Sequence, residues 1–396
     1  MTASLFSRLL NSIRGNTPRL RRLAQGLLHN ERLHQTNLAR LQAQPKNDKR
    51  FLFVADGFSC YGGAETRIAD QMEYLASKGY DCWLFTQYND NERLLRFPNL
   101  FLPRFFATSF ERQLIEIIRT GQFDNVEFIV KSYRYFRKTN IERVKAHART
   151  GVSVLNTTRM PERLLQSFDY LISFYQFKSA KETLIRNWIS TPIPDEAKRW
   201  HYCGQKRALY IARLHPGKMP ELKNFLDVCE RYGIAFDIMG PIDKAHRPEV
   251  QAQLKRIPRE SLLKPTNAVP FLSTHSDRYL FVGGEGLVAL EASALGFPVM
   301  VTSQQDDGRS CMITRDNFDL LYRYNFVIRT IPNDPTLIGA DIDAFIRAAS
   351  DGVSDLYRID PTQFDSQTLS EAMKIYLRAV ENSTKTCCFL GNSNEV

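Results

Sequence analysis

The chain has 396 residues, of which 43% are hydrophobic and 24% charged, so it is long enough for two globular domains and is neither fibrous nor disordered. It contains no run of about 18 apolar residues, so we expect no membrane-spanning helix, and residues 3–10 are too short and too charged for the core of a signal peptide. Seven scattered cysteines show no spacing typical of a zinc site and indicate a reducing, cytoplasmic environment.

The net charge of +10 is concentrated near the N-terminus, because residues 1–50 hold ten Arg or Lys side chains and only two acidic ones. Leucines recur there at helical spacing on both sides of Pro18, so residues 1–48 are predicted to form a basic amphipathic helical extension. Through residues 1–45 such a helix can dock on an anionic inner membrane surface or on a partner protein. The alternatives are packing against the rest of the chain or a second subunit, and disorder. Nucleic acid is not expected as a partner, because aromatic side chains for base stacking are nearly absent here.

From residue 50 onward, short apolar runs typical of buried strands alternate with segments of helical periodicity. This alternation predicts an α/β protein with parallel, doubly wound sheets. The predicted strands are 51–55, 82–85, 126–130, 152–155, 170–173, 208–212, 236–239 and 299–301.

A polar, Pro-containing stretch at 190–206 interrupts this alternation and indicates a linker. Residues 49–195 are therefore assigned to an N-terminal Rossmann-like domain, and residues 206–365 to a C-terminal Rossmann-like domain. A late helix at about 366–382 is expected to pack back onto the first domain. In this architecture, ligands bind in the cleft between the carboxyl ends of the strands.

The most informative segment is a Gly-rich turn that leads directly into a predicted helix. A helix that begins on glycines offers free backbone N–H groups and the positive end of its dipole to a phosphate or another anion. Gly284, Gly286 and Leu287 are therefore predicted to bind the donor. Glu291, about two turns beyond the start of the glycine run, is suited to accept hydrogen bonds from hydroxyls such as those of a ribose. This segment predicts a nucleotide-sugar site.

Other segments that follow predicted strands carry related chemistry. Arg213 and Lys218 are two cations at a strand end, where they can stabilise charge on a leaving oxygen without a metal. Gly62 and Gly63 follow the first strand, where glycines allow the backbone to approach a ligand closely. Gly240 lies in a similar turn after a later strand. The alternatives for these positions are solvated loops and ordinary turns.

Together these features resemble the GT-B-fold glycosyltransferases, and most closely the large retaining family 4, over roughly residues 50–380. The resemblance implies two Rossmann-like domains facing across a cleft, the N-terminal one on the acceptor side and the C-terminal one binding the nucleotide sugar. It places Gly62, Gly63 and Gly240 near the donor. It also implies that Arg213 and Lys218 neutralise the diphosphate leaving group. Both are accordingly predicted to be catalytic.

The chain departs from the family pattern of two glutamates separated by seven residues. The second glutamate matches Glu291, which the resemblance implies holds the ribose hydroxyls. Gly283 stands where the first is usual, and Glu285, two residues later, is the candidate that takes its place as a third catalytic residue. Because the family's first glutamate contacts the transferred sugar, this departure leaves the donor sugar open and weakens the inference of retaining stereochemistry.

The acceptor side carries weaker candidates. Lys131, Tyr133 and Arg134 follow a predicted strand, and cations interleaved with aromatic rings suit an acidic or phosphorylated sugar. Arg159 lies in a loop where many family members carry a histidine, and it is a further polar candidate. A solvated sheet edge is the alternative interpretation of this region.

We therefore expect a glycosyltransferase that needs no cofactor and moves a sugar from a nucleotide-sugar donor to a saccharide or lipid-linked acceptor. No metal is expected, because the adjacent carboxylates at 306–307 would make a poor cage for an ion. The basic N-terminus favours surface polysaccharide or lipopolysaccharide biosynthesis, in the cytoplasm or peripherally on the cytoplasmic membrane face. The alternatives are another GT-B activity, such as a nucleotide-sugar epimerase, which the sparse histidines disfavour, and a catalytically silent GT-B binding or scaffold protein.

Overall fold

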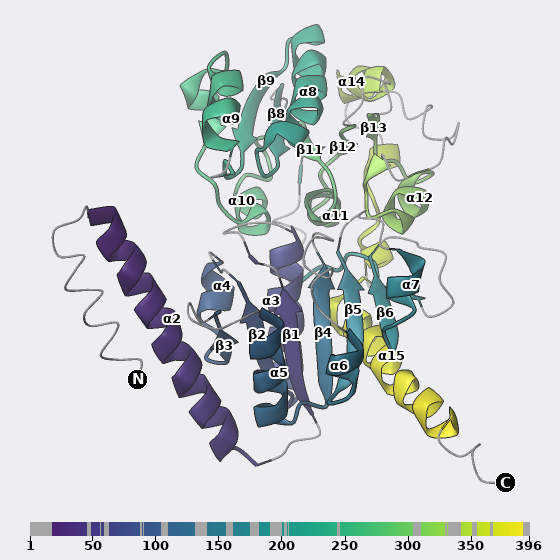
Figure 1. Cartoon of the computed structure of the whole chain (residues 1–396). Coiled ribbons are helices and arrows are strands. Elements are labelled where there is room, and N and C mark those ends of the chain that lie inside the picture. The colour runs from purple at the N-terminus through teal and green to yellow at the C-terminus, as the bar shows by residue number, and fades with distance from the viewer. Residues whose placement is uncertain are drawn as a thin grey trace.

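The computed structural model of the protein consists of two α/β domains, with a long helix lying beside the first (Figure 1). It describes residues 18–45, 49–55, 57–58, 63–87, 89, 91–103, 110–130, 141–155, 161–174, 182–190, 200–201, 204, 206–243, 246–303, 310–328, 331, 342–350, 355–364 and 367–390. Among these residues no helix is both long enough and apolar enough to cross a membrane.

The N-terminal domain is built on a parallel sheet with the strand order β3-β2-β1-β4-β5-β6-β7. Its strands are β1 (Arg50–Ala55), β2 (Asp81–Thr86), β3 (Leu100–Phe101), β4 (Asn125–Val130), β5 (Arg149–Val154), β6 (Tyr170–Ser173) and β7 (Glu182–Leu184). Its helices are α3 (Gly63–Ser77), α4 (Glu92–Leu95), α5 (Phe110–Gly121), α6 (Ile141–Lys145) and α7 (Glu162–Leu165). Every residue of β1 and β4 is buried, as expected for central strands of a parallel sheet covered by helices on both faces.

The C-terminal domain repeats this plan with the strand order β10-β9-β8-β11-β12-β13, in which only β13 runs antiparallel among the described strands. Its strands are β8 (Arg207–Ile211), β9 (Ala235–Met239), β10 (Leu262–Leu263), β11 (Phe281–Gly284), β12 (Val299–Val301) and β13 (Cys311–Met312). Its helices are α8 (Met219–Arg231), α9 (Arg247–Leu254), α10 (Ala268–Thr274), α11 (Leu287–Ala294), α12 (Phe318–Arg323) and α14 (Ile342–Ser350). Short 3-10 turns are η4 (Pro216–Lys218), η6 (Arg259–Ser261), η8 (Asp355–Tyr357) and η9 (Pro361–Phe364).

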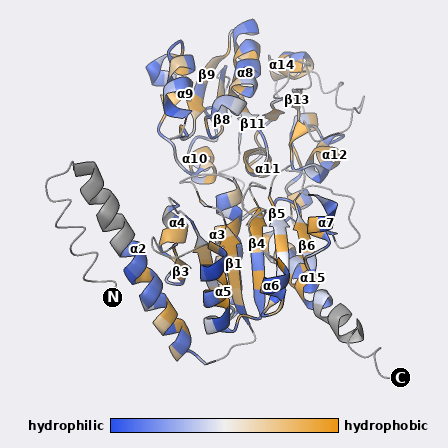
Figure 2. Cartoon of the chain, in the orientation of Figure 1, coloured by the Kyte–Doolittle hydropathy of each residue, from blue (hydrophilic) through white to orange (hydrophobic). Residues whose placement is uncertain are grey.

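The strands of the two sheets consist mostly of hydrophobic residues, whereas hydrophilic residues lie on the outer faces of the surrounding helices (Figure 2). Each sheet has apolar clusters on both of its faces, so each domain has its own core. The prediction of two doubly wound α/β domains is confirmed. Short edge strands such as β3 and β7 were not predicted, because two or three residues carry no detectable alternation.

The second half of the N-terminal helix α2 (Pro18–Ala43) is part of the N-terminal domain. Leu38 and Leu41 are buried in the same cluster as the core strands. Asn37 Nδ2 donates a hydrogen bond of 2.6 Å to the carbonyl oxygen of Leu100 on β3. Arg40 donates to the carbonyl oxygen of Pro98 at 2.8 Å, and its guanidinium lies 4.9 Å from the centre of the Trp83 ring.

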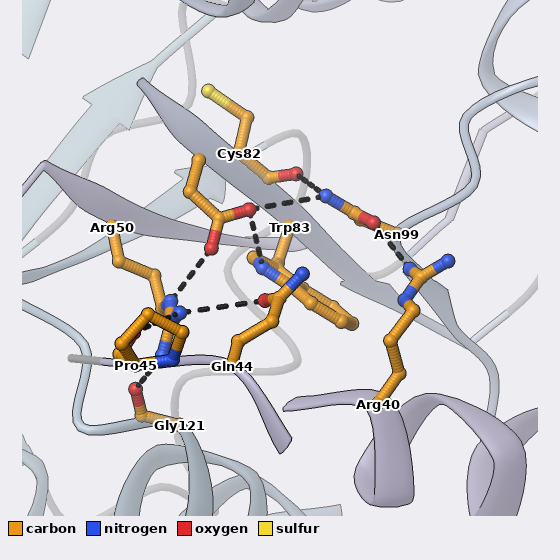
Figure 3. Close-up of polar contacts among 9 residues, drawn as sticks. Arg40, Gln44, Pro45, Arg50, Cys82, Trp83, Asn99 and Gly121 are labelled. Atoms are coloured by element: carbon orange, nitrogen blue, oxygen red, sulfur yellow. Dashed lines mark hydrogen bonds and ion pairs between the residues drawn. The ribbon is translucent and has the colours of Figure 1, made fainter. Parts of the chain in front are cut away.

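A buried arginine fixes the chain where α2 ends and the first strand begins (Figure 3). Arg50 is almost fully buried and pairs with Asp81 at 2.7 Å. It also donates to the carbonyl oxygens of Gly121 and Pro45, at 2.7 and 3.0 Å, and to Gln44 at 3.3 Å. From about His34 onward, the N-terminal extension therefore packs against the rest of the chain, which was one of the alternatives for it.

The C-terminal helix α15 (Leu369–Leu390) returns to the N-terminal domain, where it contacts α3, β6 and β7. Met373, Tyr376 and Val380 are buried in the core on that face of the first sheet. This is the segment predicted as a helix at about 366–382. The chain therefore enters the second domain after β7 and returns to the first at α15.

Candidate active site

Two helices from different domains begin next to each other. Gly63 is the first residue of α3, and a Cβ atom built on it would lie 3.8 Å from the Cβ of Leu287, the first residue of α11. The first-turn N–H groups of a helix have no acceptor within the helix, and its dipole is positive at that end. The structure thus brings two predicted donor-binding residues together at the domain junction.

The turn before α11 explains why the glycine run departs from the family pattern. A Cβ atom on Gly283 would lie 2.5 Å from the Phe225 ring, so no side chain fits at the position where the first family glutamate is usual. Gly284 is also confined, with Val288 at 3.0 Å and the Ile211 carbonyl oxygen at 3.1 Å from a built Cβ. The chain leaves β11 at Gly284, and Glu285 is the first residue of the turn with room for a side chain.

Glu285 projects toward Lys218 and forms an ion pair with it. The same lysine Nζ donates to both carboxylate oxygens of Glu221, at 2.8 and 2.9 Å. Glu221 is fully buried, and Thr302 Oγ1 donates to it at 3.4 Å. Burial, with the charges of Glu221 and Glu285, raises the pKa of Tyr210 well above its usual range, so this phenol stays protonated.

Arg213 lies on the loop that follows β8, and its charge acts on His215 together with that of Lys218. The loop is held against the next one by the bond from Leu214 N to the carbonyl oxygen of Pro241 at 2.8 Å. Arg213 is exposed, whereas the neighbouring His215 is half-buried. Burial first, and then the charges of Arg213 and Lys218, lower the pKa of His215. The histidine is therefore neutral near pH 7, and the positive charge here belongs to Arg213 and Lys218.

Gly240 has a packing role in this same pair of loops. A Cβ atom built on it would lie 1.7 Å from the carbonyl oxygen of Ala212, so only glycine allows the two loops to meet. This close approach is sufficient to explain why a glycine is required here. A contact between Gly240 and the donor remains a prediction.

Glu291, on the second turn of α11, faces the N-terminal domain. Its side chain is 9% exposed, and within the described parts of the chain no residue donates a hydrogen bond to it. Burial, followed by the charge of Asp70 on α3, raises the pKa of Glu291 to about 8. Asp70 itself is well partnered, because it pairs with Arg93 at 2.8 Å and accepts from Trp188 Nε1 at 3.3 Å. The two carboxylates therefore differ: one is satisfied by the protein, and the other is not.

Several predicted site residues lie outside the described part of the chain, so their proposed roles remain predictions. They are Gly62, Lys131, Tyr133, Arg134 and Arg159. Within the described ranges, no three His, Cys, Asp or Glu side chains are placed to share a metal ion.

The sequence analysis missed Glu221 and Asp70. Glu221 had a usable signal, since it lies three residues after Lys218 at the start of a predicted helix, where such pairs face each other. Asp70 had none, because its proximity to Glu291 depends on how two domains meet.

Comparison with known proteins identifies the fold family, although only solved structures match. No protein-family model and no curated protein matches the sequence. Solved structures do match: a glycosyltransferase from Rickettsia africae ESF-5 aligns with a TM-score of 0.57 at 10% identity, covering 86% of this chain and 100% of its own. The apo form of the lipopolysaccharide outer core galactosyltransferase WaaB aligns with a TM-score of 0.52 at 14% identity, covering 84% of this chain and 99% of its own.

The chain has the GT-B fold. This confirms the predicted fold class over most of the chain. In GT-B terms, the junction of α3, α11 and Lys218 lies between the two Rossmann-like domains, at the carboxyl ends of their strands.

Proposed function

We propose that this protein is a glycosyltransferase that moves a sugar from a nucleotide-sugar donor to a saccharide or lipid-linked acceptor. The observation that carries the proposal is Glu291, a nearly buried carboxylate without a hydrogen-bond donor among the described residues. Its oxygens are not fully enclosed, so a ligand with two adjacent hydroxyls can reach them and donate to them. Its place on a helix that begins at a glycine turn fits a ribose joined to a diphosphate.

In this arrangement the donor ribose binds Glu291 and the diphosphate lies between the start of α11, Lys218 and Arg213. Lys218 is already held by two carboxylates, so the donor must displace one of them. Glu221 is fully buried and binds the lysine through both oxygens, whereas Glu285 belongs to the turn that leads into α11. We infer that Glu285 gives way to the diphosphate and becomes available to the hydroxyls of the transferred sugar.

The chemistry then depends on charge and position. The bond between the anomeric carbon and the diphosphate oxygen breaks, while an acceptor hydroxyl oxygen forms the new glycosidic bond and loses its proton. Lys218 and Arg213 stabilise the negative charge on the departing diphosphate, and Glu221 keeps the lysine in place. We propose that this proceeds without a metal or cofactor and with retention of configuration, with the leaving phosphate accepting the proton.

The acceptor side is proposed from the sequence. Lys131, Tyr133, Arg134 and Arg159 remain the candidates for binding the acceptor. The basic residues before His34 favour a role on the cytoplasmic face of a membrane, or docking on a partner, in surface polysaccharide or lipopolysaccharide biosynthesis. A WaaB-like fold is compatible with that role.

The proposal is tested by thermal denaturation with UDP, GDP, ADP and CMP, and by hydrolysis assays with their common sugar conjugates. A nucleotide present at about 100 times its dissociation constant should stabilise the protein by roughly 2.7 kcal/mol. Lys218→Met should remove this stabilisation. Lys223→Met is the matched control, because Lys223 lies on the exposed side of the following helix and pairs with Asp227.

Stabilisation by one nucleotide, lost in Lys218→Met and kept in Lys223→Met, would support the donor site and identify the donor class. Nucleotide binding without any sugar hydrolysis or transfer would favour a catalytically silent GT-B protein. Absence of binding by all four nucleotides would contradict the proposal.

A further inference from the structure

The segment that follows α12 has an unusual backbone. Asn325 and Phe326 are consecutive non-glycine residues with φ angles of 52° and 55°, in the left-handed region, and both side chains are fully buried. This conformation is rare for a bulky residue such as Phe, and it persists only where surrounding contacts hold it. The contacts of this turn are therefore informative about its role.

One set of contacts joins the turn to the N-terminal domain and the linker. The backbone N–H of Asn187 donates to Asn325 Oδ1 at 2.7 Å, and Asn325 Nδ2 donates to the carbonyl oxygen of Phe174, directly after β6. Tyr322 OH, in the last turn of α12, donates to the carbonyl oxygen of Asn187 at 3.2 Å. Both backbone polar groups of Asn187 are thus bound by side chains of the C-terminal domain, in a buried setting where losing a partner is costly.

A second contact joins the same turn to the donor turn, which we define as residues 284–287. The backbone N–H of Gly286 donates to the carbonyl oxygen of Phe326 at 3.2 Å. Gly286 has a φ of 66° and directly precedes α11, and its neighbour Glu285 contacts Lys218. In Figure 1, α11 and α12 lie at the level where the two domains meet.

We propose that the turn at Asn325–Phe326 couples the donor turn to the position of the N-terminal domain, with Asn325 as the positioning residue. A movement of the domains that breaks the bonds of Asn325 to Asn187 and Phe174 removes what holds the left-handed backbone. Relaxation of φ to negative values then turns the Phe326 carbonyl away and releases Gly286. Coupling of this kind is reciprocal, so occupation of the donor turn favours the joined arrangement of the domains.

The identity of the ligand rests on the proposed function, but the coupling itself is a property of the ligand-free chain. Hydrogen exchange of the backbone amides tests it in the full-length protein. Asn325→Gly removes both side-chain bonds, and because glycine adopts positive and negative φ angles readily, the backbone can relax without a steric barrier. This variant should speed exchange about tenfold at 186–188 and also at 286–288, a size typical of coupling between sites.

Gln122→Gly is the matched control, because Gln122 also has a left-handed φ, of 48°, but lies at the end of α5, away from the junction. It should leave both segments unchanged. Tyr322→Phe keeps the ring and loses only the hydrogen bond to the carbonyl oxygen of Asn187, so it covers the case in which the glycine variant does not fold. Its smaller rise in exchange should again appear at both segments. Faster exchange at 186–188 alone would overturn the coupling.

A second arm adds UDP. In the wild type, UDP should protect 286–288 and also 186–188, whereas in Asn325→Gly the protection should stay at 286–288. Protection confined to 286–288 in the wild type would also overturn the coupling. If UDP does not bind the wild type, a uridine donor is contradicted, and the ligand-free arm still decides whether the coupling exists.

Discussion

Two buried carboxylates, one in each domain, differ in the hydrogen bonds that the surrounding protein donates to them. Glu127, on β4 in the N-terminal domain, is fully buried and accepts hydrogen bonds from the hydroxyls of Ser153, Tyr170 and Tyr376. Glu291, at the domain junction, has no donor among the described residues. Burial raises the pKa of both carboxyl groups, but the hydrogen bonds oppose the rise only for Glu127.

The difference indicates different roles. The hydroxyl of Tyr376 comes from α15, so Glu127 helps to hold the C-terminal helix on the N-terminal domain. A carboxylate whose hydrogen bonds all come from the protein contributes to the fold. One that receives no hydrogen bond from the protein, on the second turn of α11, is available to a ligand. The same substitution at the two positions should therefore have opposite consequences.

The largest expected effect is on stability, at Glu127. Glu127→Leu leaves three buried hydroxyls without their acceptor, and each unsatisfied group costs about 1–3 kcal/mol. We expect the free energy of unfolding to fall by roughly 3 kcal/mol in urea denaturation, while nucleotide affinity stays at the wild-type value. Loss of nucleotide binding in the folded variant would show that Glu127 is not purely structural.

The next effect is on binding, at Glu291. Glu291→Leu removes the acceptor for the ribose hydroxyls and should weaken nucleotide binding at least about tenfold, or 1.4 kcal/mol, in isothermal titration calorimetry. Stability should be unchanged or higher, because a buried carboxyl without partners is replaced by an apolar group. A stability loss as large as that of Glu127→Leu would remove the distinction between the two carboxylates.

The pH dependence sharpens the comparison further. The folded-state pKa of Glu291, raised to about 8, lies above the value of about 4.3 for an unfolded chain. The native state therefore holds this proton more tightly, and its contribution to stability is full below pH 4.3 and is lost as the pH rises to about 8. Hydroxyls that donate to the carboxylate favour its ionised form, so nucleotide affinity should rise severalfold from pH 7 to 8.5 and then level off. Glu291→Gln should abolish this rise, and its persistence in that variant would assign it to another group.

The smallest expected effect is at Glu285. Glu285→Gln removes the charge that competes with the diphosphate for Lys218, so nucleoside diphosphate affinity should increase roughly threefold, the size of a partly exposed ion pair. Sugar transfer should nevertheless slow, because the carboxylate for the sugar hydroxyls is lost. Weaker diphosphate binding in this variant would contradict the exchange of partners on Lys218.

The sequence was sufficient for features that depend on local pattern. Short apolar runs located the central strands of the first sheet and three strands of the second, but not β11, which ends in the glycine run. The glycine run together with Lys218 located the donor turn. Glu285 was identified as the carboxylate two residues after Gly283, and the Phe225 ring explains why no side chain can stand at 283 itself.

Features that depend on distant parts of the chain were not predictable in the same way. Asn37 and Arg40 look like solvent-facing helix residues in the sequence, yet they bind carbonyl groups at 98–100. Asn325 follows an unremarkable helix, and its role appears only when its bonds to Asn187 and Phe174 are seen. No local pattern encodes which side chains meet at a domain junction.

The most direct test of the account is one thermal-denaturation series on three proteins: wild type, Glu127→Leu and Glu291→Leu, each with and without the nucleotide that stabilises the wild type most. The account predicts a lower melting temperature but a full nucleotide shift for Glu127→Leu, and an unchanged or higher melting temperature with no shift for Glu291→Leu. A full nucleotide shift in Glu291→Leu would contradict the central claim that this carboxylate binds the donor.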